Sequence, residues 1–112
     1  LDKNLTFSFK KIIYLMNSLA VSSNAEFYFV YLPGFDRYSN KQYVNYNLEE
    51  YEQIIKILDQ MNINYIDVHK ELFKKTEKPL ELFSQTSYNY YNNFGNNLVS
   101  KIIVDRINEF EN

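Results

Sequence analysis

Apolar side chains recur every three or four positions in the first twenty residues, which is the spacing of one helical face. The positions are Phe9, Ile12, Ile13, Met16, Leu19 and Ala20. A polar stretch at residues 22–24 interrupts this pattern, and an aromatic and β-branched run follows over residues 25–32. Pro33 and Gly34 end that run. The run is typical of a buried strand in a parallel sheet that helices cover on both faces.

A second helix and a second strand are predicted after a connection at residues 33–47. The connection is polar and rich in tyrosine, and it is long for a loop, so we expect it to be functional or partly structured. Asn47 is predicted to cap the helix, with Glu50 reaching back as in a capping box. The apolar stripe of this helix is Leu48, Tyr51, Ile54, Ile55, Leu58 and Met61. Asn62 ends it, and residues 63–68 are predicted to form a strand after a right-handed crossover.

The C-terminal third contains the clearest helical pattern. A helical turn is predicted at residues 69–74 and an irregular segment at 77–91, after which Asn92 or Asn93 caps a long helix. Its stripe is Phe94, Leu98, Val99, Ile102, Ile103, Ile107 and Phe110. Two parallel strands are too few for a stable sheet. A third strand in the irregular segment, a partner chain or an upstream segment would complete it. We favour the upstream segment, because the chain begins at Leu1 without an initiator Met.

Composition removes several classes of function. The 112 residues carry 12 basic and 14 acidic side chains, a net charge of −2, so the basic surface of a nucleic-acid binder is absent. Without cysteine there is no disulfide framework and no thiol nucleophile. No apolar stretch approaches the length of a membrane-spanning helix. The chain contains 11 Tyr, 9 Phe and no Trp. Tyrosines can stack on sugars, although they can equally line the edge of a core.

The stretch from Leu82 to Ile103 resembles the last block of SGNH (GDSL-type) hydrolases. In that family an irregular loop ends in an acid, a His, an aromatic and an Asn, and a Gly opens the C-terminal helix. Tyr91, Asn92 and Gly95 match the aromatic, the Asn and the Gly. The resemblance implies that residues 1–112 are the C-terminal part of one α/β domain, a three-layer flavodoxin-like fold with parallel strands. It further implies a carbohydrate esterase or acyltransferase as the parent protein.

The same resemblance predicts that this chain is not catalytically competent alone. Tyr90 occupies the family's His position, and Ser87 or Tyr88 occupies the position of the acid. A phenol with a pKa near 10 is a poor general base at neutral pH, and neither Ser87 nor Tyr88 supplies a carboxylate. The Gly-Asp-Ser nucleophile turn and the oxyanion-hole blocks are also absent. No catalytic residue is therefore assigned, and no cofactor is predicted.

The only histidine, His69, lies two residues after Asp67 at the end of the second predicted strand. The carboxyl ends of parallel strands are where α/β proteins place their ligands. The simpler interpretation is that Asp67 caps the following turn and His69 is a solvated turn residue. A metal site built from Asp36, Asp67 and His69 has the right ligand types but no motif spacing, so no metal is predicted.

Tyrosines and one asparagine in the two loops are the candidate binding residues. They are Tyr38, Tyr43, Tyr46, Tyr88, Tyr90, Tyr91 and Asn92. If both loops lie at the carboxyl ends of the strands, these side chains share one rim, where they could bind a glycan, an acyl ester or a protein. Ordinary packing between the two loops is the alternative. The sequence thus leaves two hypotheses: part of an SGNH-like esterase or acyltransferase, or a non-catalytic module that binds a glycan or a protein.

Overall fold

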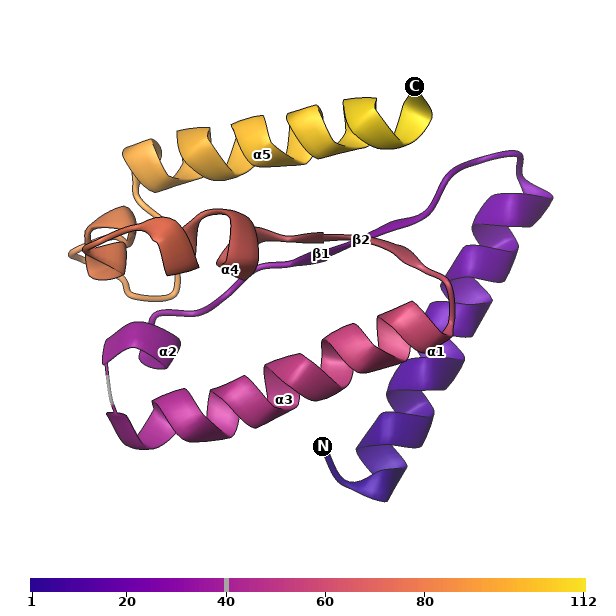
Figure 1. Cartoon of the computed structure of the whole chain (residues 1–112), viewed down its shortest axis with the longest axis horizontal. Coiled ribbons are helices and arrows are strands. Elements are labelled where there is room, and N and C mark those ends of the chain that lie inside the picture. The colour runs from indigo at the N-terminus through magenta and orange to yellow at the C-terminus, as the bar shows by residue number, and fades with distance from the viewer. Residues whose placement is uncertain (40) are drawn as a thin grey trace. The chain divides into compact units, whose positions relative to one another are not determined.

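The computed structural model describes residues 1–39 and 41–112, and the side chains of residues 41–47 lie outside that description. The elements in chain order are α1 (Lys3–Ser22), β1 (Tyr28–Tyr31), α2 (Asp36–Ser39), α3 (Lys41–Gln60), β2 (Asn64–Asp67), α4 (Val68–Glu71), the 3-10 turns η1 (Phe73–Lys75) and η2 (Pro79–Leu82), and α5 (Asn93–Glu111). Strands β1 and β2 pair as a two-stranded parallel sheet (Figure 1). The chain is therefore a mixed α/β protein, as predicted.

The ends of the long helices follow local chemistry. Helix α1 begins six residues before the predicted start, because the side chain of Asp2 caps it by accepting the N–H of Leu5 at 2.8 Å. Both helices that lead into a strand end at an asparagine with positive φ, Asn24 at 57° and Asn62 at 56°. Asparagine tolerates this left-handed conformation better than most residues. The predicted ends of both helices are thus confirmed.

The connection at residues 33–47 is partly structured, which is one of the two expected alternatives, whereas the predicted helix cap at Asn47 is wrong. Helix α2 occupies Asp36–Ser39, and α3 begins at Lys41. Asn47 therefore lies inside a helix and is not its N-cap. Beyond Pro33 and Gly34 the segment contains no helix-breaking residue. Tyr43 and Tyr46 belong to α3 by their backbone, but their side chains lie outside the described residues.

The strands are shorter and less buried than the sequence predicts. Strand β1 covers four residues of the predicted eight, and all four are half-buried. The predicted fully buried strand is therefore wrong for β1. In the irregular segment, a single antiparallel bridge joins Phe83 to Tyr91, and no third strand forms among the described residues. Completion of the sheet by an upstream segment remains a prediction.

One of two compact units contains Leu1–Phe29 and Leu48–Tyr65. Its core is built from Ile13, Leu58 and Ile63, with Phe9 and Phe29 packed edge to face at 5.8 Å between ring centroids. Much of the apolar surface of α1 is exposed, at Leu5, Phe7, Ile12, Tyr14, Leu15, Met16, Leu19 and Val21. The hydrophobic periodicity of this helix therefore identifies more apolar surface than the unit itself buries.

The other unit contains Val30–Asn47 and Ile66–Asn112. Its buried core consists of Ile66, Val68, Phe73, Leu82, Phe83 and Val99. Helix α5 covers this core with the predicted stripe, since Leu98, Ile102, Ile103, Ile107 and Phe110 pack against it. Helix α5 also packs on α4, where Arg106 forms an ion pair with Glu71 at 3.3 Å. The pocket described next lies entirely in this unit.

Candidate functional site

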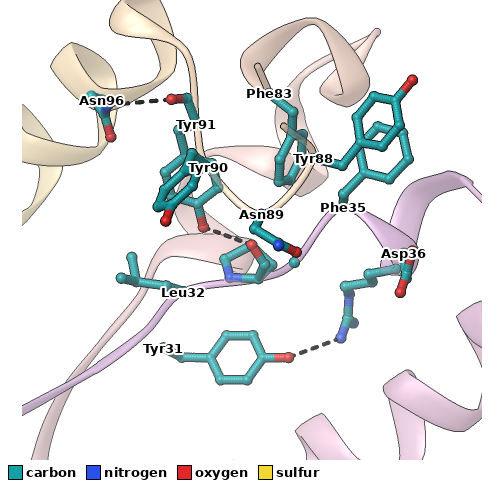
Figure 2. Close-up of a pocket in the computed structure, with 13 residues that line it drawn as sticks. Tyr31, Leu32, Phe35, Asp36, Phe83, Tyr88, Asn89, Tyr90, Tyr91 and Asn96 are labelled. Atoms are coloured by element: carbon teal, nitrogen blue, oxygen red, sulfur yellow. Dashed lines mark hydrogen bonds between the residues drawn. The ribbon is translucent and has the colours of Figure 1, made fainter. Parts of the chain in front are cut away.

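A pocket of about 570 Å³ opens where the chain leaves β1. Two segments line it: residues 31–37, which follow the strand, and residues 83–96, which lead into α5 (Figure 2). The lining combines aromatic residues with Asn89, Asn96, Asp36 and Arg37. A concave site with an aromatic wall and a few polar groups is the usual form of a small-molecule binding site.

The first wall is shaped by the turn that ends β1. Pro33 and Gly34 cannot extend the strand, and the N–H of Arg37 donates to the Gly34 carbonyl at 3.3 Å, which starts α2. Across the pocket the Tyr91 hydroxyl donates to the Pro33 carbonyl at 2.6 Å (Figure 2). Burial, and secondarily the neighbouring Tyr31, raises the pKa of Tyr91, so its hydroxyl stays protonated and remains a donor. This bond joins the two walls.

The second wall is a short loop closed by its own backbone. The N–H of Ser84 donates to the Tyr90 carbonyl at 2.9 Å, and the Ser84 hydroxyl accepts the N–H groups of Thr86 and Ser87 at 3.3 and 3.2 Å. The N–H of Tyr90 donates to the Ser87 carbonyl at 3.2 Å. These backbone groups of the loop are thus satisfied within the loop itself.

Tyr88 and Tyr90 are the most exposed aromatic residues of the pocket, at 55% and 69% of their surface. The ring of Tyr88 stacks on Phe35 with centroids 4.2 Å apart and planes 16° apart (Figure 2). One face of Tyr88 is therefore covered by Phe35, which restricts the orientation of a ring that is otherwise largely exposed.

Positions 87 and 90 are those that the resemblance to SGNH hydrolases aligns with a catalytic acid and a histidine. The side chain at 90 is a phenol, and the described contacts of Ser87 are backbone bonds within the loop. Among the described residues, no three His, Cys, Asp or Glu side chains gather closely enough to hold a metal ion. The arrangement can hold a ligand by stacking and hydrogen bonding.

A network of hydrogen-bonded side chains lies behind the first wall. Arg37 is 5% exposed and donates from Nη1 to the Tyr31 hydroxyl at 3.3 Å and from Nη2 to Nε2 of His69 at 3.2 Å. The hydroxyl of Tyr38 lies 2.7 Å from Nδ1 of His69. Burial, and then the charge of Arg37, lowers the pKa of His69 from 6.5 to about 4.

The interpretation of His69 as a solvated turn residue is therefore wrong, because both of its ring nitrogens contact buried or half-buried side chains. The capping role of Asp67 is confirmed by its bond to the N–H of Lys70 at 3.0 Å.

Asn92 fixes the start of α5 and the end of the pocket loop together. Its Oδ1 accepts the N–H of Gly95 at 2.8 Å, which is the predicted N-cap. Its Nδ2 donates to the carbonyls of Glu81 and Phe83 at 2.6 and 3.2 Å. Asn92 is therefore a structural residue of the site, and no described contact gives it a place on the pocket surface.

We expect Asn92→Asp to destabilise the protein by about 1 to 3 kcal/mol, because it keeps the capping oxygen but replaces two donated bonds with carboxylate–carbonyl repulsion. Asn93→Asp is the matched control, since Asn93 is exposed in the first helical turn, where a negative charge is favourable. Urea denaturation measures both. Equal stability of the two variants would contradict the role assigned to the Asn92 amide.

The structure brings together three of the predicted tyrosines, Tyr88, Tyr90 and Tyr91, in one pocket. Tyr38 packs inward instead, parallel to Phe73 at 5.3 Å between centroids, and is not among the lining residues. Sequence reasoning missed Phe35, Arg37, Asn89 and Asn96, and it considered Asp36 only as part of a metal site. A usable signal was present for Phe35, Asp36 and Arg37, because they directly follow the Pro-Gly sequence that ends a strand.

Comparison with known proteins gives no assignment. No family model matches the chain, and no curated protein or solved structure shows significant similarity to it. None of the helices that the structure describes has both the length and the apolar character required to cross a bilayer. The functional argument therefore depends on the pocket.

Proposed function

We propose that the chain binds a carbohydrate in the pocket between residues 31–37 and 83–96, without catalysing a reaction. The observation that carries this proposal is the pairing of two exposed tyrosines, Tyr88 and Tyr90, with amide and carboxylate groups in one concave site. The apolar C–H face of a sugar ring packs against an aromatic face, whereas its hydroxyls need polar partners.

The positions of the polar groups support a saccharide over a wholly apolar ligand. Asn89 lies on the loop between the two tyrosines, Asn96 lies in the first turns of α5, and Asp36 lies on the opposite wall (Figure 2). Each carries at least one hydrogen-bonding oxygen, and the amides add donors. A sugar lying on Tyr88 could therefore use donors and acceptors from both walls. The stacking of Tyr88 on Phe35 reduces the entropy lost on binding, because the ring is already oriented.

A second candidate function keeps the chain within the fold that its sequence resembles. We propose that the domain is a three-layer, flavodoxin-like SGNH-type half-domain belonging to a carbohydrate esterase or acyltransferase. Support comes from the predicted block around Asn92, whose side chain caps α5 and whose neighbour Gly95 packs tightly on Leu82. In this case a preceding segment must supply the nucleophile, the base and the oxyanion hole, because Tyr90 and Ser87 cannot act as the His and the acid.

Calorimetric titration with trisaccharides of N-acetylglucosamine and of glucose tests the binding proposal. We expect binding of at least one of them, and a loss of about tenfold in affinity for Tyr88→Ala and for Tyr90→Ala, since a stacking contact contributes on the order of 1 kcal/mol. Tyr14→Ala is the control, because Tyr14 is comparably exposed but lies on α1 in the other unit. Failure of both sugars to bind, or an equal loss with Tyr14→Ala, would overturn the proposal.

Hydrolysis of p-nitrophenyl acetate tests whether the chain alone is catalytically inactive, which both candidates require. We expect no turnover by the natural chain or by Tyr90→His, because an imidazole alone restores neither a nucleophile nor an oxyanion hole. Turnover by the natural chain would contradict the non-catalytic proposal and would show that Tyr90 has been aligned with the wrong family position.

A further inference from the structure

The side-chain network of Arg37, His69 and Tyr38 connects the pocket wall to the end of β2. Arg37 lines the pocket, whereas His69 and Tyr38 are not among the lining residues. The two contacts of the imidazole are Nε2 to Arg37 Nη2 at 3.2 Å and Nδ1 to the Tyr38 hydroxyl at 2.7 Å. Both ring nitrogens of His69 are thus within hydrogen-bond distance of a side chain of α2.

The chemistry of Arg37 fixes the protonation state that fits this geometry. A guanidinium can only donate, so Nε2 of His69 must be the acceptor and must carry no proton. The single proton of the neutral ring then lies on Nδ1, which donates to the oxygen of Tyr38. A doubly protonated imidazolium would place an N–H and a positive charge directly against Arg37.

We infer that His69 is a positioning residue that holds the Arg37 side chain in the pocket wall only while its imidazole is neutral. Protonation of His69 would then release the Arg37 side chain from the wall and weaken ligand binding in the pocket. This inference rests on the proposed function for its ligand, but the coupling between the imidazole and the wall does not need one. Arg37 also donates to Tyr31, so its displacement would disturb two lining residues at once.

The groups around His69 mostly oppose its protonation. Arg37 from α2 and Lys74 from η1 lower its pKa, whereas Asp67 at the end of β2 raises it; burial has the largest effect and lowers it. Tyr38 from α2 stays a neutral phenol, because burial raises its pKa. Helix α5, which packs on α4, brings Arg106, and this charge is paired with Glu71. The balance lowers the pKa of His69 to about 4.

The sign of the pH effect follows from this direction. The folded pKa lies below the ordinary value of 6.5, so the stability contributed by the neutral network is complete above pH 6.5. That stability declines as the pH falls below 6.5 and is lost once the pH passes about 4. Release of the Arg37 side chain in the folded protein follows the pKa of His69 in the folded state, and we therefore expect it near pH 4.

Nuclear magnetic resonance of the protein labelled with ¹⁵N provides a direct test, because a single histidine gives a single imidazole signal. We expect an Nδ1–H tautomer at pH 7, a midpoint near pH 4, and the same midpoint for the backbone amide shifts of residues 35–38. An imidazole midpoint near 6.5, the opposite tautomer, or wall amides that do not follow the imidazole would overturn the inference. This measurement requires no variant.

Binding of the N-acetylglucosamine trisaccharide, measured at pH 6 and pH 3 with folding checked by circular dichroism, tests the consequence for the pocket. For a pKa of about 4, we expect the natural protein to lose about tenfold in affinity over this range. His69→Gln offers a neutral acceptor that does not titrate, so its affinity should change less, and the remaining change reports other groups such as Asp36. Equal pH dependence of the two proteins would overturn the inference.

The two proposals fail in different ways. Absence of sugar binding at every pH, together with a shared midpoint for the imidazole and the wall amides, would overturn the proposed function and support the coupling. Sugar binding that is independent of pH, with the imidazole titrating near pH 4, would support the proposed function and overturn the release of the wall.

Discussion

Replacement of Gly95 by alanine is expected to destabilise the protein, although a glycine-to-alanine change within a helix usually has the opposite effect. A Cβ at this position would fall well inside the van der Waals contact distance from the Leu82 carbonyl oxygen and lie 3.3 Å from the Leu82 Cβ. That oxygen is backbone and also accepts the N–H of Asn92 at 3.0 Å, so it cannot move without cost. The crowding should outweigh the gain of about 1 kcal/mol in helix propensity.

We expect a net loss of about 2 kcal/mol for Gly95→Ala, which corresponds to a fall in Tm of about 10 °C. The only other glycine of the chain provides the control, because a Cβ on Gly34 would meet no atom within 4 Å. Gly34→Ala should therefore leave Tm within about 2 °C of the natural value. If Gly95→Ala is as stable as Gly34→Ala, α5 does not approach Leu82 as closely as the structure indicates.

The start of α5 is also where the sequence was most informative. The stripe from Phe94 to Phe110 has the helical period, and an asparagine precedes it, so the periodicity and the cap independently indicate the same boundary. Both signals are local, because they depend on residues within a few positions of each other. The resemblance to the SGNH block stays a prediction.

The helices within residues 33–47 could not be assigned from the sequence, because local signals conflict there. The Pro-Gly sequence indicates a turn, and no apolar stripe of helical spacing follows it, but a polar segment can form a helix without one. Within the short helix α2, successive side chains point in different directions. Tyr38 lies two positions after Asp36, which is about half a turn of helix, so the two face different ways. Asp36 accordingly lines the pocket, whereas Tyr38 packs on Phe73.

The contact between Arg37 and His69 could not be predicted from sequence. The two residues are 32 positions apart, and their contact depends on how β1 and β2 pair and on where α2 and α4 begin. A lone histidine with no neighbouring nucleophile or ligand motif gives no indication of such a partner. The tyrosines of the loop at residues 84–91 were easier to predict, because only their own loop has to project them outward.

Truncation of Phe83 should have the largest effect on both the fold and the pocket. Phe83 is 2% exposed, and it packs against the rings of Phe35, Phe73 and Tyr91 at 5.5, 5.5 and 5.1 Å between centroids. It also lines the pocket, so the same ring supports the core and the binding site. We expect Phe83→Ala to cost about 3 to 5 kcal/mol, a large fraction of the stability of a small domain.

The control for this change is Phe94→Ala, because the same side chain is removed at a site that is 64% exposed. It should cost less than about 1 kcal/mol.

Phe83→Leu separates cavity formation from loss of the aromatic contacts. Leucine retains most of the volume, so this variant should recover much of the stability but not the edge-to-face packing with Phe35. Thermal unfolding of the three variants measures these differences in stability, and sugar titration of Phe83→Leu measures the affinity of the altered pocket for its ligand. If Phe83→Ala were no less stable than Phe94→Ala, the ring of Phe83 would not form the shared base of the core and the pocket.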